Sequence, residues 1–224
     1  MMRSTEEKTV LLCALDDDLE GLTSLLESKS ANDTQQSENI LWEKDDVGRN
    51  ALFAACTLGR SRIVRELVRN GADVNNLTAR GYSALHYSAM WGQLDTLKTL
   101  VELKADFQAI SFRGEKAVDV ARRYHKLDCA EYLAWAEAKQ SLQALVEDIR
   151  NIITDPEKVQ GKLNKEDKTV CINTCSAKSD WIHNTKNATI QDFIEQKKHL
   201  EDILAPVLLK LNTQSEATVK TRKP

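Results

Sequence analysis

Apolar residues recur with helical spacing in the first part of the chain, in short blocks between polar turns. Residues 94–101 carry apolar side chains at steps of three, three and one, the spacing of one helix face. They are Leu94, Leu97, Leu100 and Val101. Before them, Ser83 can cap the start of another short helix, and Gly92 can end it because glycine tolerates the left-handed conformation. The pattern predicts a helix–turn–helix unit, which needs stacked neighbours to bury its apolar face.

The same pattern returns at an interval of 33 residues. The positions that coincide are small or apolar, as packing requires. They are Gly48, Gly81 and Gly114; Ala51, Ala84 and Ala117; Leu52, Leu85 and Val118; and Leu67, Leu100 and Leu133. A chain that repeats in this way is expected to stack its units into a solenoid.

Two segments carry a family resemblance. Residues 48–56 (GRNALFAAC) and 81–89 (GYSALHYSA) resemble the ankyrin-repeat motif Gly-x-Thr-Pro-Leu-His-x-Ala-Ala, with alanine in place of its proline. Residues 70–75 (NGADVN) are similar to the end of that repeat. The resemblance implies an all-α ankyrin solenoid of helix–turn–helix units. In the third unit Asp119 takes the usual histidine position, and His125 stands where glycine is expected.

We expect four regions in the chain. Residues 1–44 form a degenerate N-terminal cap repeat plus a polar loop, and residues 45–136 hold the ankyrin repeats. A helical bundle at 137–212 and a disordered tail at 213–224 follow. The expected repeat boundaries within the second region are 45–77, 78–110 and 111–136.

Beyond residue 136 the repeat register is lost and longer amphipathic patterns begin. One helix should stop before the Asp155-Pro156 pair, and whether it continues the last repeat or starts anew stays open. Two later helices should start at capping pairs, and Pro206 should kink or split the last helix. The capping pairs are Asn164 with Asp167 and Thr189 with Asp192.

Residues 138–212 resemble the α-helical lid of the seventy-kilodalton heat-shock chaperones. The similar marks are residues 157–168, Trp181-Ile182, Phe193 and Pro206-Val207, in the same order and spacing. That family's ATPase domain and peptide-binding β-sandwich have no counterpart in this sequence, so chaperone activity is not implied. A heat-shock chaperone or its clients is the partner that this resemblance suggests.

Composition narrows the function classes. Lys and Arg number 31 against 34 Asp and Glu, so the chain has no basic excess for nucleic acid. With 8 Gly and 3 Pro it has few turn residues for a β protein. Residues 1–10 lack the apolar core of a secretory signal, and no apolar run reaches the roughly 18–20 residues that span a bilayer. We expect a cytoplasmic protein with reduced, buried cysteines, no membrane insertion, and association with a cytoskeletal structure.

No constellation of residues indicates an enzyme, and neither a cofactor nor a metal is expected. Glycine-rich phosphate loops are absent from the sequence, and His86 at the repeat's histidine position suggests a structural hydrogen bond. Asp16, Asp17 and Asp18 form a helix–helix turn rather than a calcium loop. One drawable zinc site has spacings that match no standard finger, so buried thiols are favoured there. Its residues would be Cys171, Cys175, His183 and His199.

What remains is a surface. In ankyrin repeats, partners contact the turn tips and the end of each first helix, which form a concave face. The resemblance maps this face by register onto Asp46, Val47, Arg49, Thr57, Leu58, Arg80, Tyr82, Met90, Trp91, Phe112, Arg113, Glu115, Arg123 and Tyr124. Such residue types are typical of interface cores. Packing of Trp91 or Tyr124 between repeats or against the helical bundle is the alternative.

Two functions follow as hypotheses. The first is a non-enzymatic adaptor or scaffold that binds another protein through the concave face. The alternative is a chaperone-linked regulator that acts through the lid-like bundle.

Overall fold

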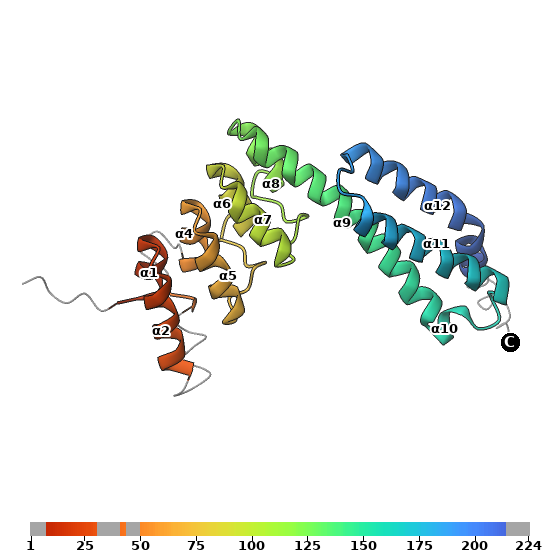
Figure 1. The fold of residues 1–224 in the computed structure, drawn as a ribbon, viewed down its shortest axis with the longest axis horizontal. Coiled ribbons are helices and arrows are strands. Elements are labelled where there is room, and N and C mark those ends of the chain that lie inside the picture. Colours follow the sequence, from red (N-terminus) through yellow and green to blue (C-terminus); the bar gives the residue numbers. More distant parts are fainter. Residues whose placement is uncertain (1–7, 31–40, 44–49, 214–224) are drawn as a thin grey trace, which may run out of the picture. The chain divides into compact units, whose positions relative to one another are not determined.

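The computed structural model describes residues 8–30, 41–43 and 50–213, and these residues fold into helices joined by turns, with no β-strand among them (Figure 1). The chain divides into two compact units, Met1–Ala134 and Trp135–Pro224. The all-helical fold class is therefore confirmed.

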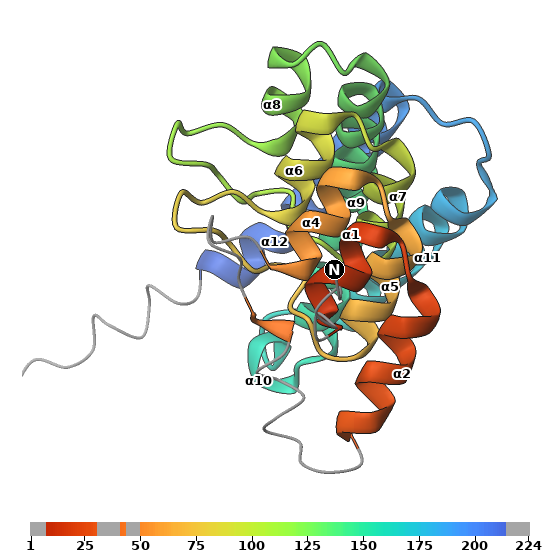
Figure 2. The same ribbon diagram turned by 90° about the vertical axis from the view of Figure 1, so that its left-hand side faces the viewer.

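The first unit is built from helix pairs stacked in two rows. Helices α1, α4, α6 and α8 pack in one row, and α2, α5 and α7 in the other. Figure 2 looks along this stack, with the second row on the right and the loops before α6 and α8 on the left. The bounds are α1 (Val10–Asp16), α2 (Leu19–Ser30), α4 (Ala51–Leu58), α5 (Ser61–Arg69), α6 (Ala84–Trp91), α7 (Leu94–Glu102) and α8 (Ala117–Arg123).

Side-chain caps start α4 and α6, and α6 begins and ends where the sequence predicts. Oδ1 of Asn50 accepts a hydrogen bond from the Phe53 amide at 3.0 Å, and Ser83 caps α6 in the same way. Gly92 ends α6 with φ 74°. The predicted cap at Ser83 and the predicted stop at Gly92 are confirmed. α4 and α6 are mostly buried, because each lies between two neighbouring helices of its row.

Successive repeats are joined through their turn tips. The Phe112 amide donates to the Arg80 carbonyl at 2.8 Å, and the Asp106 amide donates to Oδ1 of Asn75 at 2.8 Å. Gly81, with φ 72°, lies so close to the next tip that a Cβ would sit 2.7 Å from the Ile110 carbonyl oxygen. The tips therefore keep a fixed register along the stack.

The N-terminal helix pair is also present. α1 and α2 meet at Asp17, whose φ of 59° ends α1, and its carboxylate pairs with Arg60 at 3.2 Å. The prediction of a helix–helix turn at this acidic run is confirmed. The polar loop expected after α2 falls mainly on residues 31–40, which lie outside the described part.

The second unit is a helical bundle with its own apolar core. It comprises the remainder of α9 (Leu127–Thr154), α10 (Pro156–Val159), α11 (Lys165–Asn184) and α12 (Ile190–Thr213). The Phe193 ring lies edge-on to Trp135 and Trp181, at centroid distances of 5.8 and 5.4 Å. The indole N–H of Trp135 donates to the Ala188 carbonyl at 2.8 Å. Buried aliphatic and thiol side chains from α9, α11 and α12 complete the core.

Helix boundaries in this unit match the sequence at three places and differ at one. α9 ends at Thr154, and both predicted capping pairs form, with Asp167 N to Asn164 Oδ1 at 2.7 Å and Asp192 N to Thr189 Oγ1 at 3.2 Å. A kink or a split was expected at Pro206, and the split is wrong, because α12 continues through it. Leu204 and Val207 on either side are buried and hold the helix on the core.

α9 continues from the last repeat and does not start anew after it. It is one helix that starts at Leu127 in the last repeat and runs on into the second unit without a break. The apolar block after residue 140 is therefore a continuation and not a new helix.

Candidate functional site

Large apolar side chains are exposed at one equivalent position in three successive repeats. Leu58, Trp91 and Tyr124 lie 33 residues apart, at the C-terminal ends of α4, α6 and α8. Their exposed fractions are 42%, 56% and 42%. Since these three helices pack side by side, the side chains form a row, which we call the helix-end row.

A second group lies at the turn tips before α6 and α8. The Phe112 ring is 60% exposed and lies edge-on to Tyr82, with 5.9 Å between the ring centroids. The guanidinium carbons of Arg80 and Arg113 lie 5.8 and 5.4 Å from the Phe112 centroid. Two arginines of successive repeats thus flank one aromatic ring. We call Arg80, Tyr82, Phe112 and Arg113 the tip cluster.

An ion pair ties the two groups together in the third repeat. Nε of Arg123 lies 2.8 Å from Oε1 of Glu115, beside the tip, and its guanidinium lies 4.6 Å from the Tyr124 centroid. Glu115 therefore already neutralises Arg123, whereas the described residues contain no carboxylate paired with Arg80 or Arg113.

Other predicted site residues are differently placed. Thr57 is half-buried and tied into the helices, since its hydroxyl donates to the Phe53 carbonyl at 2.9 Å and its carbonyl accepts from Gln93 at 3.0 Å. Met90 is half-buried. Asp46, Val47 and Arg49 lie outside the described residues.

Comparison with known proteins agrees with the repeat architecture. A family model for ankyrin repeats (3 copies) matches residues 10–111. Over 99% of its length the chain is 80% identical to the whole of ankyrin repeat domain-containing protein 45 from Danio rerio. The chain belongs to the ankyrin-repeat family. The Homo sapiens protein of that name is 42% identical over 94% of this chain and 78% of its own length, and the Mus musculus protein 44% over 92% and 84%.

The histidine of the ankyrin motif has a structural role here. His86 is fully buried, and its Nδ1 lies 3.1 Å from the Ser83 amide and 2.8 Å from the Ser83 hydroxyl. Its Nε2 lies 3.0 Å from the Glu115 carbonyl of the next repeat. Burial lowers the pKa of His86, which keeps the ring neutral. The predicted structural hydrogen bond is confirmed.

The third of the units with 33-residue spacing solves the same problems with different residues. Oδ2 of Asp119, at the histidine position, accepts from the Lys116 amide at 3.1 Å and so caps α8. His125 replaces the helix-ending glycine and adopts a left-handed φ of 55°. Asp119 thus keeps the cap of α8, and His125 keeps the left-handed turn after it.

The candidate zinc ligands do not converge. Cys171 and Cys175 are buried in the second unit, and burial raises the pKa of both thiols. His183 and His199 are exposed, and no group of three or more metal-ligating side chains occurs among the residues described. The prediction of buried thiols is confirmed. In the first unit, burial raises the pKa of Cys56 to about 12.

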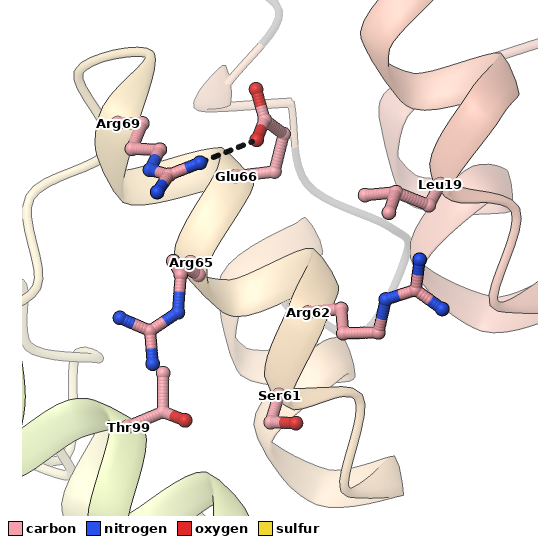
Figure 3. Close-up of a pocket in the computed structure, with 7 residues that line it drawn as sticks. All are labelled: Leu19, Ser61, Arg62, Arg65, Glu66, Arg69 and Thr99. Atoms are coloured by element: carbon pink, nitrogen blue, oxygen red, sulfur yellow. Dashed lines mark ion pairs between the residues drawn. The ribbon is translucent and has the colours of Figure 1, made fainter.

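One pocket of the ankyrin unit was not anticipated from the sequence. It has a volume of about 280 Å³ and is lined by Arg62, Arg65 and Arg69 of α5, with Leu19 of α2 and Thr99 of α7 (Figure 3). The three arginines follow helical steps of three and four, which is the signal that could have found them.

Most of this pocket's charge is already paired. Arg65 lies 2.6 Å from Glu102, and Arg69 lies 3.7 Å from Glu66. Only Arg62 has no carboxylate partner among the described residues. The pocket lies in the second helix row, apart from the tip cluster.

In the described part of the chain, no helix is both long and apolar enough to cross a membrane.

Proposed function

We propose that this ankyrin-repeat protein is a non-enzymatic adaptor that binds a partner protein through the tip cluster and the helix-end row. The observation that carries the proposal is the helix-end row, which repeats an exposed large side chain at each 33-residue step. Trp, Tyr and Arg are the residue types that dominate binding energy at protein interfaces. An exposed row with a Trp and a Tyr, together with a tip cluster that holds two Arg, is typical of an interaction surface.

Exposure supports this proposal over packing between repeats. If Trp91 and Tyr124 held the repeats together, they would be covered as Phe53 is, at 2% exposure. Instead about half of each ring faces solvent. Their removal should therefore weaken partner binding far more than it weakens the fold.

The test is affinity purification with the full chain. The helix-end variant carries Trp91→Ala with Tyr124→Ala. A matched control carries Ile172→Ala with Ile194→Ala. Ile172 and Ile194 are 55% and 51% exposed and belong to the second unit. We expect that the wild type and the control recover a set of proteins that the helix-end variant loses. The melting temperature of the helix-end variant should stay close to that of the wild type.

Two results would contradict the proposal. A large fall in the melting temperature of the helix-end variant would mean that the rings of Trp91 and Tyr124 belong to the core. An unchanged set of proteins would move the function to the second unit. If a seventy-kilodalton chaperone were then lost only with the control variant, the chaperone-linked alternative, which rests on resemblance to the lid, would replace the adaptor.

The expected place of action is the cytoplasm, in association with a cytoskeletal structure. Imaging of the tagged full chain with a cytoskeletal marker tests this expectation. Uniform cytoplasmic signal would contradict the cytoskeletal part alone.

A further inference from the structure

The tip cluster combines two positive charges with an exposed ring, and none of the described carboxylates pairs with these charges. Arg80 and Arg113 are exposed and flank Phe112, with no ion pair to either arginine in the described parts of the chain. The chain as a whole has a net charge of −3, so carboxylates are abundant elsewhere. Among the described residues, none of these carboxylates pairs with Arg80 or Arg113, so both guanidinium groups are available to a partner.

From this geometry we infer that the tip cluster receives an acidic segment of the partner, in which an apolar side chain is flanked by carboxylates. The inference rests on the proposed function, because it names the chemistry that the same surface selects. The apolar side chain would pack on Phe112 and Tyr82. Its flanking carboxylates would pair with the two guanidinium groups.

The guanidinium chemistry suits this role. A guanidinium group that lies on an aromatic ring still offers N–H donors at its edge, in a planar fork that fits a carboxylate. Next to a ring and a bound peptide, these charges would be partly removed from water, which strengthens their attraction to a carboxylate.

Nearby arginines provide an internal contrast. Arg123 is already bound to Glu115 at 2.8 Å, so it adds little free charge to the surface. On the second helix row, Arg65 and Arg69 also have carboxylate partners. Of these arginines, Arg80 and Arg113 are the two that flank an exposed ring, and no described carboxylate pairs with either of them. Phosphate groups would also satisfy two arginines, but two arginines are few for a nucleic-acid surface, which pairs with many phosphates, and this favours a peptide.

The test selects binders from a displayed library of random peptides, with the full chain as bait. The best peptide is then labelled, and its Kd is measured by fluorescence anisotropy. Three proteins are compared: wild type, Arg80→Gln with Arg113→Gln, and the matched control Arg62→Gln with Arg69→Gln. A labelled single-stranded oligonucleotide serves as the competing probe.

We expect acidic peptides with an apolar residue among the carboxylates. The tip variant should bind them at least about tenfold more weakly, while the control stays within about twofold of wild type. Binding should weaken as salt rises. Arg123→Gln should change Kd less than Arg113→Gln does. Arg80→Lys with Arg113→Lys keeps both charges and should restore part of the affinity.

Other outcomes would overturn the inference. Selected peptides without acidic excess that depend on Trp91 and Tyr124 would leave the adaptor proposal standing and refute the acidic segment. If the selected peptides ignored both the tip and the helix-end variants, both would fail. Tighter binding of the oligonucleotide than of any peptide, or a library that yields no binder, would also refute the acidic segment.

Discussion

Replacing His86 should show how strongly one side chain couples two repeats. A backbone N–H can only donate, so the Ser83 amide at 3.1 Å makes Nδ1 of His86 an acceptor. The neutral ring then carries its proton on Nε2 and donates it to the Glu115 carbonyl at 3.0 Å. The hydroxyl of Ser83 donates to the same Nδ1 at 2.8 Å. His86 thereby joins the start of α6 to the tip before α8.

The expected cost of His86→Ala follows from these contacts. The substitution leaves the buried Ser83 amide without its side-chain acceptor and opens a cavity at a position with 0% exposure. A buried unpaired polar group costs about 1–3 kcal/mol, and the cavity adds to it. Glu115 is half-buried, so water can replace the lost donor there. We expect a loss of about 3 kcal/mol in the free energy of unfolding of the ankyrin unit.

The same contacts predict a pH dependence. Burial lowers the pKa of His86, so the fold favours the neutral ring. The stability gained in this way is present above the unfolded pKa of about 6.5 and is lost as pH falls through the lower folded value. The wild-type protein should therefore lose stability below about pH 6.5, and its advantage over His86→Ala should shrink. Asp18 in the same unit has a lowered pKa and titrates outside this window.

The measurement is hydrogen exchange of peptides from α6 and α8, because a local reading separates the ankyrin unit from the second unit. His125→Asn is the matched control, since it removes an exposed histidine while asparagine tolerates the left-handed backbone. The control should keep the wild-type pH dependence. A cost below about 1 kcal/mol, or an advantage that stays constant or grows toward low pH, would refute the assigned hydrogen bonds.

Two further substitutions test the packing. Gly81→Ala should cost about 1–2 kcal/mol more than Gly114→Ala in urea unfolding, because both have φ near 72° but only at Gly81 would a Cβ meet a backbone oxygen, at 2.7 Å. Equal costs would show that the tips can move apart. Lys178 is buried beside the uncharged Gln196 amide and His199 Nδ1, and burial lowers its pKa. Because methionine removes this buried charge, Lys178→Met should stabilise the second unit by about 1 kcal/mol at neutral pH. This gain should vanish above about pH 10, where the unfolded lysine is also neutral; a loss at neutral pH would show that the hydrogen bonds outweigh desolvation.

Local chemistry made much of the fold predictable. Ser83 and Gly92 set the start and the end of α6, because a side-chain cap and a left-handed glycine act within one turn of the helix. The 33-residue interval then carries the same result to the neighbouring repeats. Of the kink or split predicted at Pro206, the split does not occur, because the effect of a proline depends on its surroundings. Two buried neighbours hold α12 together across it.

The candidate site was predictable only in part, because it forms between repeats. Register alone places Arg80 and Arg113 at equivalent positions, 33 residues apart. Phe112 has Ala79 as its counterpart one repeat earlier, so the pattern within a repeat does not show that one ring meets both arginines. The arginine pocket on α5 was missed for another reason: its residues lie outside the face that the ankyrin resemblance highlights.

The repeat geometry largely separates the residues that hold the fold from those that bind. His86 is buried between repeats, whereas Trp91, five residues later on the same helix, is more than half exposed. Gly81 is where the two roles meet, because its close approach to Ile110 sets how the tip bearing Arg80 lies against the tip bearing Phe112. Gly81→Ala should therefore weaken both stability and peptide binding. Phe112→Ala should weaken binding alone, since most of its ring faces solvent.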